Sequence, residues 1–148
     1  MPNSQDPIRV LSVTSDESLS ELIRTALGSE EGYLLISGDE LGNELIEDIE
    51  RLKPNCILLD YINPNVNPLG LIDSISLQFP EIMIIVILPR DKITEANQVI
   101  LAGARAFLVQ PLNKIQLLET LERIKELYLR NQQAKTAVAV GEPAVANR

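Results

Sequence analysis

Residues 55–64 read NCILLDYINP, a short apolar run that ends on an aspartate and is followed by a turn containing proline. A run of this length, rich in branched apolar side chains and bounded by turn residues, is typical of a strand that is buried on both faces. Asp60 closes the run. Its carboxylate either performs chemistry at the end of a buried strand or accepts backbone N–H groups as a turn former in the DYINP bend. The residues alone leave both interpretations open.

Two similar apolar segments precede this run and two follow it, so that the chain carries five in total. The intervals between them contain apolar residues at helical spacing, as at Leu19, Ile23 and Ala26. These intervals are too long for hairpin turns, but they suit the crossovers between parallel strands. The pattern predicts an α/β fold, a (βα)5 doubly wound five-stranded parallel sheet. The five predicted strands begin at Ile8, Tyr33, Asn55, Ile82 and Arg105.

The composition restricts the chemistry that this chain can perform. The 148 residues include no histidine and a single cysteine, Cys56, which lies inside the apolar run. This excludes histidine-dependent triads, histidine-ligated metals and thiolate zinc clusters, and it predicts a reducing, cytoplasmic location. The net charge of −8 opposes binding to nucleic acid, and the longest apolar run, 82–88, is too short to cross a membrane. We therefore expect a soluble protein without nucleic-acid or membrane partners.

The ends of the chain differ in composition from its centre. Residues 1–6 form a short polar tail, and residues 7–130 contain the alternating strands and helices. Residues 131–148 are small and polar, include Gly141 and Pro143, and lack an apolar face, which predicts a linker or disordered tail. Two interpretations follow: a stand-alone adaptor with a flexible end, or the amino-terminal part of a longer protein, which the linker composition favours.

The carboxyl ends of the predicted strands define the candidate site. In an open parallel α/β sheet, ligands bind in the crevice beyond these ends. Asp60 is the one carboxylate that directly ends a predicted strand, whereas Asp16 and Asp39 suit the N-caps of helices. The residues at the five strand ends are Thr14, Ser15 and Asp16, then Gly38 and Asp39, then Asp60, then Leu88 and Pro89, and finally Gln110 and Pro111.

Residues 7–130 resemble the receiver domains of bacterial response regulators, the CheY-like family. CILLDYINP is similar to the family's third strand, which ends on the phosphoacceptor aspartate, and GARAFLVQP is similar to its fifth strand with the flanking turn and proline. The resemblance implies the strand order 2-1-3-4-5, the phosphoacceptor position at Asp60 and a switch aromatic at Phe107. It also implies a cis peptide bond before Pro111, against a background of roughly 5 to 6% for bonds before proline.

The residues that support phosphoryl chemistry in this family are replaced here. The family's Mg²⁺-binding acidic pair corresponds to Thr14 and Ser15, with Asp16 one position late, and Mg²⁺ needs well-placed carboxylates. The hydroxyl residue that moves toward the phosphoryl group corresponds to Leu88, and the lysine that pairs with it corresponds to Gln110. The resemblance therefore implies a degenerate receiver, or pseudo-receiver, that is no enzyme and has no cofactor and at most weak Mg²⁺ binding. An active phosphorelay receiver is the alternative.

A degenerate receiver acts mainly through protein contacts, and the last predicted helix offers candidates for them. Three leucines lie outside its apolar stripe, Leu118, Leu127 and Leu129, and we expect them to form a homodimer or partner surface. The missing acidic pair and lysine, together with the linker, resemble the receivers that precede a MinD-like ATPase in pilus-assembly proteins of the TadZ and CpaE type. This resemblance implies a dimerising or targeting module that is joined to a C-terminal effector domain.

Overall fold

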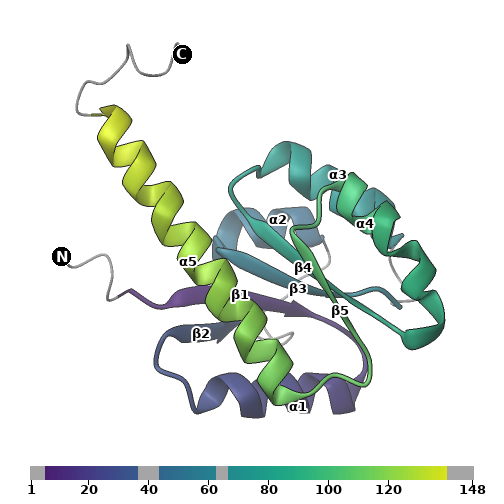
Figure 1. The fold of residues 1–148 in the computed structure, drawn as a ribbon. Coiled ribbons are helices and arrows are strands. Elements are labelled where there is room, and N and C mark those ends of the chain that lie inside the picture. Colours follow the sequence, from purple (N-terminus) through teal and green to yellow (C-terminus); the bar gives the residue numbers. More distant parts are fainter. Residues whose placement is uncertain (1–5, 37–43, 63–66, 140–148) are drawn as a thin grey trace.

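The computed structural model describes residues 6–36, 44–62 and 67–139, which form a five-stranded parallel sheet covered by helices (Figure 1). The strand order is β2-β1-β3-β4-β5, so the predicted fold class and order are confirmed. The central strand is β3, which ends on Asp60 and pairs with β1 and β4. The strands are β1 (Ile8–Val13), β2 (Tyr33–Ile36), β3 (Cys56–Asp60), β4 (Met83–Leu88) and β5 (Ala106–Val109).

The helices lie on both faces of the sheet (Figure 1). α1 and α5 pack against one face, and α2, α3 and α4 pack against the other. A short 3-10 helix, η3, leads from β4 into α4. The helices are α1 (Glu17–Gly28), α2 (Leu45–Leu52), α3 (Pro68–Gln78), η3 (Arg90–Glu95), α4 (Ala96–Ala102) and α5 (Lys114–Ala139).

Burial on both faces explains why β3 and β4 are continuously apolar in sequence. Successive side chains of a strand point to opposite faces. Leu58 and Ile85 therefore join the core under α1 and α5, while Leu59 and Val86 join the core under α2, α3 and α4. All residues of both strands are buried. Asp60 is thus the polar end of a strand that has no solvent-facing side.

α3 and α5 each begin at an asparagine whose side chain caps the helix. The Asn67 Oδ1 atom accepts a hydrogen bond from the Gly70 N–H at 3.4 Å, and Pro68 occupies the first turn of α3. The Asn113 Oδ1 atom accepts one from the Gln116 N–H at 2.8 Å, at the start of α5. These oxygens satisfy N–H groups that a helix leaves unpaired at its first turn. The caps therefore fix where α3 and α5 begin.

α5 is longer than the sequence pattern predicts. It continues to Ala139, so residues 131–139 are helical and not disordered, and their role as a linker stays a prediction. Gln, Ala and Lys are good helix formers, and extending an anchored helix requires no new nucleation. The end of α5 projects beyond the sheet (Figure 1). The predicted linker residues 140–148, and the tail residues 1–5, lie outside the described residues.

No helix within the described parts of the chain is both long and apolar enough to span a membrane.

Candidate functional site

The carboxylate of Asp60 lies where the carboxyl ends of β1 and β3 meet. Because these strands are paired in parallel, Thr14, which follows β1, reaches Asp60 from the neighbouring strand. The Thr14 hydroxyl donates a hydrogen bond to Asp60 Oδ2 at 2.6 Å, and the Ile62 N–H donates one to Asp60 Oδ1 at 3.2 Å. The side chain of Asp60 is therefore held by both an adjacent strand and its own turn. Asp60 is only 5% exposed.

The turn-former interpretation of Asp60 is correct in part. The hydrogen bond from Ile62, two residues further along the chain, is the contact expected of an aspartate that initiates a turn. The hydroxyl of Thr14 is an additional donor that a simple turn does not require. Asp60 consequently combines a turn contact with a position at the crevice of the sheet.

Burial is the main influence on the acidity of Asp60. Loss of hydration raises the pKa of this carboxyl above its ordinary value, and the negative charge of Asp16 adds to the rise. The hydrogen bonds from Thr14 and Ile62 act in the opposite direction, because they stabilise the ionised form, and they lower the pKa. The net change is upward, so the carboxylate is less stabilised than that of an exposed aspartate.

Asp16 caps α1, as its sequence position suggests. Its Oδ1 atom accepts hydrogen bonds from the Ser18 N–H at 2.9 Å, the Ser18 hydroxyl at 2.8 Å and the Leu19 N–H at 3.2 Å. The contacts with Ser18 and Leu19 hold the pKa of Asp16 below its ordinary value. Thr14 also accepts a hydrogen bond from the Asp16 N–H at 3.0 Å. Asp16 therefore stabilises a helix start, and Thr14 lies between the two aspartates.

Neither Leu88, which ends β4, nor Gln110, which follows β5, provides a hydroxyl or a cation. Leu88 is fully buried in the core under α2, α3 and α4. Its carbonyl accepts a hydrogen bond from the Gln110 N–H at 2.8 Å. The peptide bond between Gln110 and Pro111 is cis, so this prediction is confirmed. A hollow of about 530 Å³ lies between Asp16, Arg90 and Gln110.

The geometry, with an aspartate closing the central strand of a doubly wound parallel sheet, agrees with one sequence comparison. The sequence profile of the response regulator receiver domain matches residues 10–122. The chain belongs to this family. Receiver domains are signalling modules, and this receiver is accordingly not an enzyme.

Similar proteins support the assignment. The receiver is 29% identical over 133 residues to the response regulator MprA of Mycobacterium leprae, which covers 90% of this chain and 56% of that protein. It is 25% identical over 118 residues to the chemotaxis protein CheY of Thermotoga maritima, covering 80% and 98%. The signal receiver domain of a Vibrio parahaemolyticus protein assigned as a Luxo repressor has a TM-score of 0.76 and 26% identity, covering 86% and 97%.

The chain spans about half the length of several curated relatives that it matches. It covers 52% of the transcriptional regulatory protein DegU of Brevibacillus brevis and 56% of MprA. The matched part of these longer proteins is therefore one region among others. Properties of their remaining regions do not transfer to this receiver.

The residues around Asp60 do not fit the Mg²⁺ ion that the family resemblance implies for a receiver domain. Asp60 Oδ2 faces the hydroxyl proton of Thr14, and Asp16 Oδ1 is committed to the cap of α1. Ser15 is exposed and adds at most one neutral oxygen. Across the described residues, no three His, Cys, Asp or Glu side chains are grouped as metal ligands. Mg²⁺ requires near-octahedral oxygen ligands that include well-placed carboxylates. At this site the receiver supplies a single carboxylate, that of Asp60.

Phe107, the predicted switch aromatic, lies on the outer strand β5 and is 37% exposed. It lines two hollows between β5 and α5, of about 480 and 280 Å³. Neither hollow includes Asp60 among its lining residues. Phe107 is thus part of the surface formed by β5 and α5, and its role as a switch stays a prediction.

Tyr61 is a residue of this region that the sequence interpretation missed. It follows Asp60, is 8% exposed, and donates its hydroxyl hydrogen bond to the carboxylate of Glu95 in η3. Burial and the charge of Glu95 raise the pKa of Tyr61 to about 12, so its hydroxyl stays protonated and able to donate at neutral pH. An aromatic residue directly after the strand-ending aspartate is the only signal that the sequence gives.

The side chains of the three leucines proposed as an interface are less exposed to solvent than expected. Leu118 and Leu127 are partly buried and pack against the core under α1 and α5, and Leu129 is half-buried. Other large apolar side chains are more exposed. Those of η3, α4 and β5 are Ile93, Ile100, Leu101 and Phe107, which we call the α4–β5 surface; Leu101 is 87% exposed.

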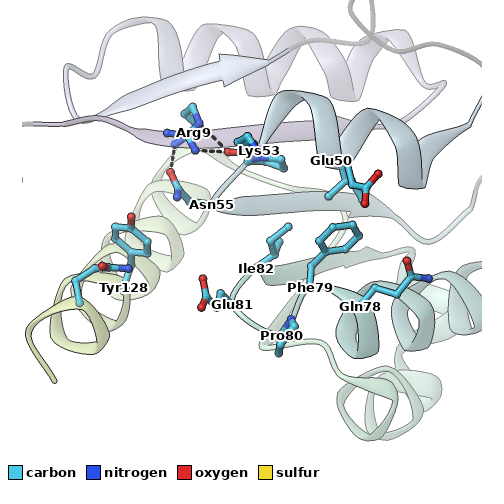
Figure 2. Close-up of a pocket in the computed structure, with 13 residues that line it drawn as sticks. Arg9, Glu50, Lys53, Asn55, Gln78, Phe79, Pro80, Glu81, Ile82 and Tyr128 are labelled. Carbon is cyan, nitrogen blue, oxygen red and sulfur yellow. Dashed lines mark hydrogen bonds between the residues drawn. The ribbon is translucent and has the colours of Figure 1, made fainter. Parts of the chain in front are cut away.

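A hollow of about 620 Å³ lies at the opposite end of the sheet, at the amino ends of the strands (Figure 2). Its lining includes Phe79 and Tyr128. The Arg9 guanidinium donates hydrogen bonds to the Lys53 carbonyl, and Asn55 Oδ1 accepts one from the Arg9 N–H at 2.8 Å. These bonds fasten β1 to the turn between α2 and β3. The contacts thus have a structural explanation that is separate from Asp60.

Proposed function

We propose that this receiver is a regulatory interaction domain in which Asp60 keeps the phosphoacceptor position without efficient phosphoryl chemistry. The observation that supports this most directly is the 2.6 Å hydrogen bond from Thr14 to Asp60. A neutral hydroxyl stands where the family resemblance calls for a carboxylate, and it satisfies Asp60 without a metal. The domain then exerts its effect through its surface and the proteins that bind there.

The replaced residues account for the size of the expected loss. Leu88 offers no hydrogen-bond donor, and Gln110 offers an uncharged amide. A hydrogen bond to a charged group contributes about 1.5–3 kcal/mol. Two such partners therefore remove about 3–6 kcal/mol of stabilisation from a phosphorylated aspartate or its transition state, or roughly two to four powers of ten.

Reaction with acetyl phosphate tests this proposal. After incubation with acetyl phosphate and Mg²⁺, under conditions that fully label an ordinary receiver domain, we expect the intact mass of this protein to be unchanged. Asp60→Asn provides the matched control. A mass increase of one phosphoryl group that disappears in the control variant would overturn the proposal.

That outcome would establish the second candidate, an active phosphoacceptor receiver of a phosphorelay. The position of Asp60 at the end of the central strand favours it, as does the similarity to response regulators such as MprA. Both candidates assign the same place in the fold to Asp60. They differ in whether a phosphoryl group ever forms there.

We further propose that the α4–β5 surface mediates contact with a second copy of the domain, with a C-terminal effector domain, or with both. Four large apolar side chains are exposed on neighbouring elements of one sheet edge, which is more than isolated surface residues account for. Leu127, one of the three leucines of α5 proposed from the sequence, lines a hollow together with Phe107 of this surface.

Self-association provides the test of this surface. We expect the isolated domain to form dimers at tens of micromolar in sedimentation experiments, and Leu101→Glu to raise the dissociation constant at least about tenfold, since it places a charge in an apolar contact. Leu34→Glu is the matched control, because Leu34 is 50% exposed on β2, at the far edge of the sheet. A strict monomer would leave hetero-recognition as the use of the surface.

The wider setting of the domain is also a proposal. We propose a cytoplasmic protein, in agreement with the free, buried thiol of Cys56, in which the receiver acts as a dimerising or targeting module. The TadZ and CpaE type of pilus-assembly protein, with a MinD-like ATPase as effector domain, is the specific setting that the missing acidic pair and lysine support. Nucleic acid and membranes are not proposed as partners.

A further inference from the structure

The residue that follows Asp60 connects the candidate site to the start of α4. The Tyr61 N–H donates a hydrogen bond to the Ile87 carbonyl at 2.9 Å, which continues the pairing of β3 with β4. The Tyr61 side chain packs into the core under α2, α3 and α4, and its hydroxyl leaves that core to reach the Glu95 carboxylate. The ring is therefore fixed at the backbone, along its apolar body and at its polar end.

Glu95 is held at the junction between η3 and α4. It is the last residue of η3 and the N-cap position of α4, and its carboxylate also lies 3.7 Å from the Lys92 Nζ atom. The side chain of Glu95 is 28% exposed, so these two partners largely determine its position. A change in the position of Tyr61 would consequently act on the first turn of α4.

Asp60 and Tyr61 share a peptide unit, and the Asp60 carboxylate is bonded to the next N–H, that of Ile62. The conformation of this turn therefore depends on what the Asp60 carboxylate accepts. The path runs without a gap from Thr14 through Asp60 and Tyr61 to Glu95 and the helix that carries part of the α4–β5 surface. Leu88 cannot supply such a link, because it has no polar atom in its side chain.

We propose that the hydrogen bond between Tyr61 and Glu95 couples the state of the Asp60 carboxylate to the position of α4. Tyr61 acts as a positioning residue: it passes a change at Asp60 and Ile62 to the N-terminus of α4. The inference adds a route of regulation to the proposed function. It does not depend on whether a second copy or an effector domain binds the α4–β5 surface.

Amide hydrogen exchange of the full chain tests the physical link. We expect Tyr61→Phe to speed exchange of the α4 amides at least about tenfold, since a hydrogen bond to a charged group is lost. Tyr33→Phe is the matched control: Tyr33 is also buried and donates to a carboxylate, that of Glu122 at 2.8 Å, on the other face of the sheet. It should leave α4 exchange unchanged. Equal effects of the two variants on α4 would overturn the proposal.

A double-mutant comparison shows whether the Tyr61–Glu95 hydrogen bond transmits changes at Asp60 to α4 or only stabilises α4. Asp60→Asn alters what the side chain accepts from Thr14 and Ile62, and we expect it to shift the NMR resonances of the α4 amides. In the Tyr61→Phe background, and equally in Glu95→Ala, the same substitution should produce less than about half of those shifts. Shifts of α4 that are the same with and without the Tyr61 hydroxyl, or absent in Asp60→Asn altogether, would show a static brace and overturn the coupling.

Discussion

A triple variant with Thr14→Asp, Leu88→Thr and Gln110→Lys should accept a phosphoryl group from acetyl phosphate at Asp60. The first change supplies a second carboxylate for Mg²⁺, the second a hydroxyl donor, and the third a cation beside the phosphoryl oxygens. Each restores a group whose absence distinguishes this site. The two restored hydrogen-bond partners, from Leu88→Thr and Gln110→Lys, should by themselves raise the rate of labelling at least about 100-fold.

The measurement is the intact mass of the triple variant over time, compared with the unmodified chain. Adding Asp60→Asn to the triple variant gives the matched control, which should show no labelling. Leu88 is fully buried, so a thermal melt is needed to establish that Leu88→Thr leaves the domain folded. A folded triple variant that labels no faster than the unmodified chain would contradict our account of the lost chemistry.

Gly103→Ala should destabilise the domain by about 3 kcal/mol. Gly103 ends α4 with a φ of 131°, in a region that L side chains rarely adopt, and a Cβ atom there would lie 2.4 Å from Ser76 Oγ. The backbone strain and the steric overlap each contribute about 1–3 kcal/mol. The expected fall in melting temperature is roughly 10 °C for a domain of this size.

The controls for this prediction use another glycine and the clashing neighbour. Gly28 is the last residue of α1, and a Cβ atom added there would have no neighbour within 4 Å, so Gly28→Ala should change stability by less than about 1 kcal/mol. Combining Gly103→Ala with Ser76→Gly should recover the steric part of the loss but not the backbone strain. Equal melting temperatures for the two single alanine variants would contradict the assignment.

The strands were predictable because their signals are local, whereas their order followed from the family resemblance. β3 and β4 are buried on both faces, which gives continuous apolar runs, and caps such as Asn67 mark the helix starts directly in the sequence. The cis bond before Pro111 followed from family resemblance rather than from any local signal. Positions that depend on one element and its own neighbours could therefore be assigned from the amino-acid sequence alone.

The contacts that sequence could not predict join residues far apart in the chain. The pairing of Tyr61 with Glu95, 34 residues apart, depends on how β3 and η3 pack, and neither residue type is unusual by itself. The degree of exposure of Leu118 and Leu127 depends equally on how closely α5 lies over the sheet. The helical conformation of residues 131–139 was not predicted, because a polar, alanine-rich segment suits both a flexible linker and a continuing helix.

The length of α5 gives the domain a mechanical output. The helix is anchored on the sheet by Leu117, Leu121 and Ile124, which are buried, and it continues as a single helix to Ala139. Leu127 and Tyr128 also pack against the core, so the stretch from Tyr128 to Ala139 makes a rigid arm of roughly 17 Å at about 1.5 Å per residue. A tilt of about 10° at the anchor would swing its tip by roughly 3 Å. A small change in how α5 packs on the sheet would thus become a larger displacement of the end of this helix.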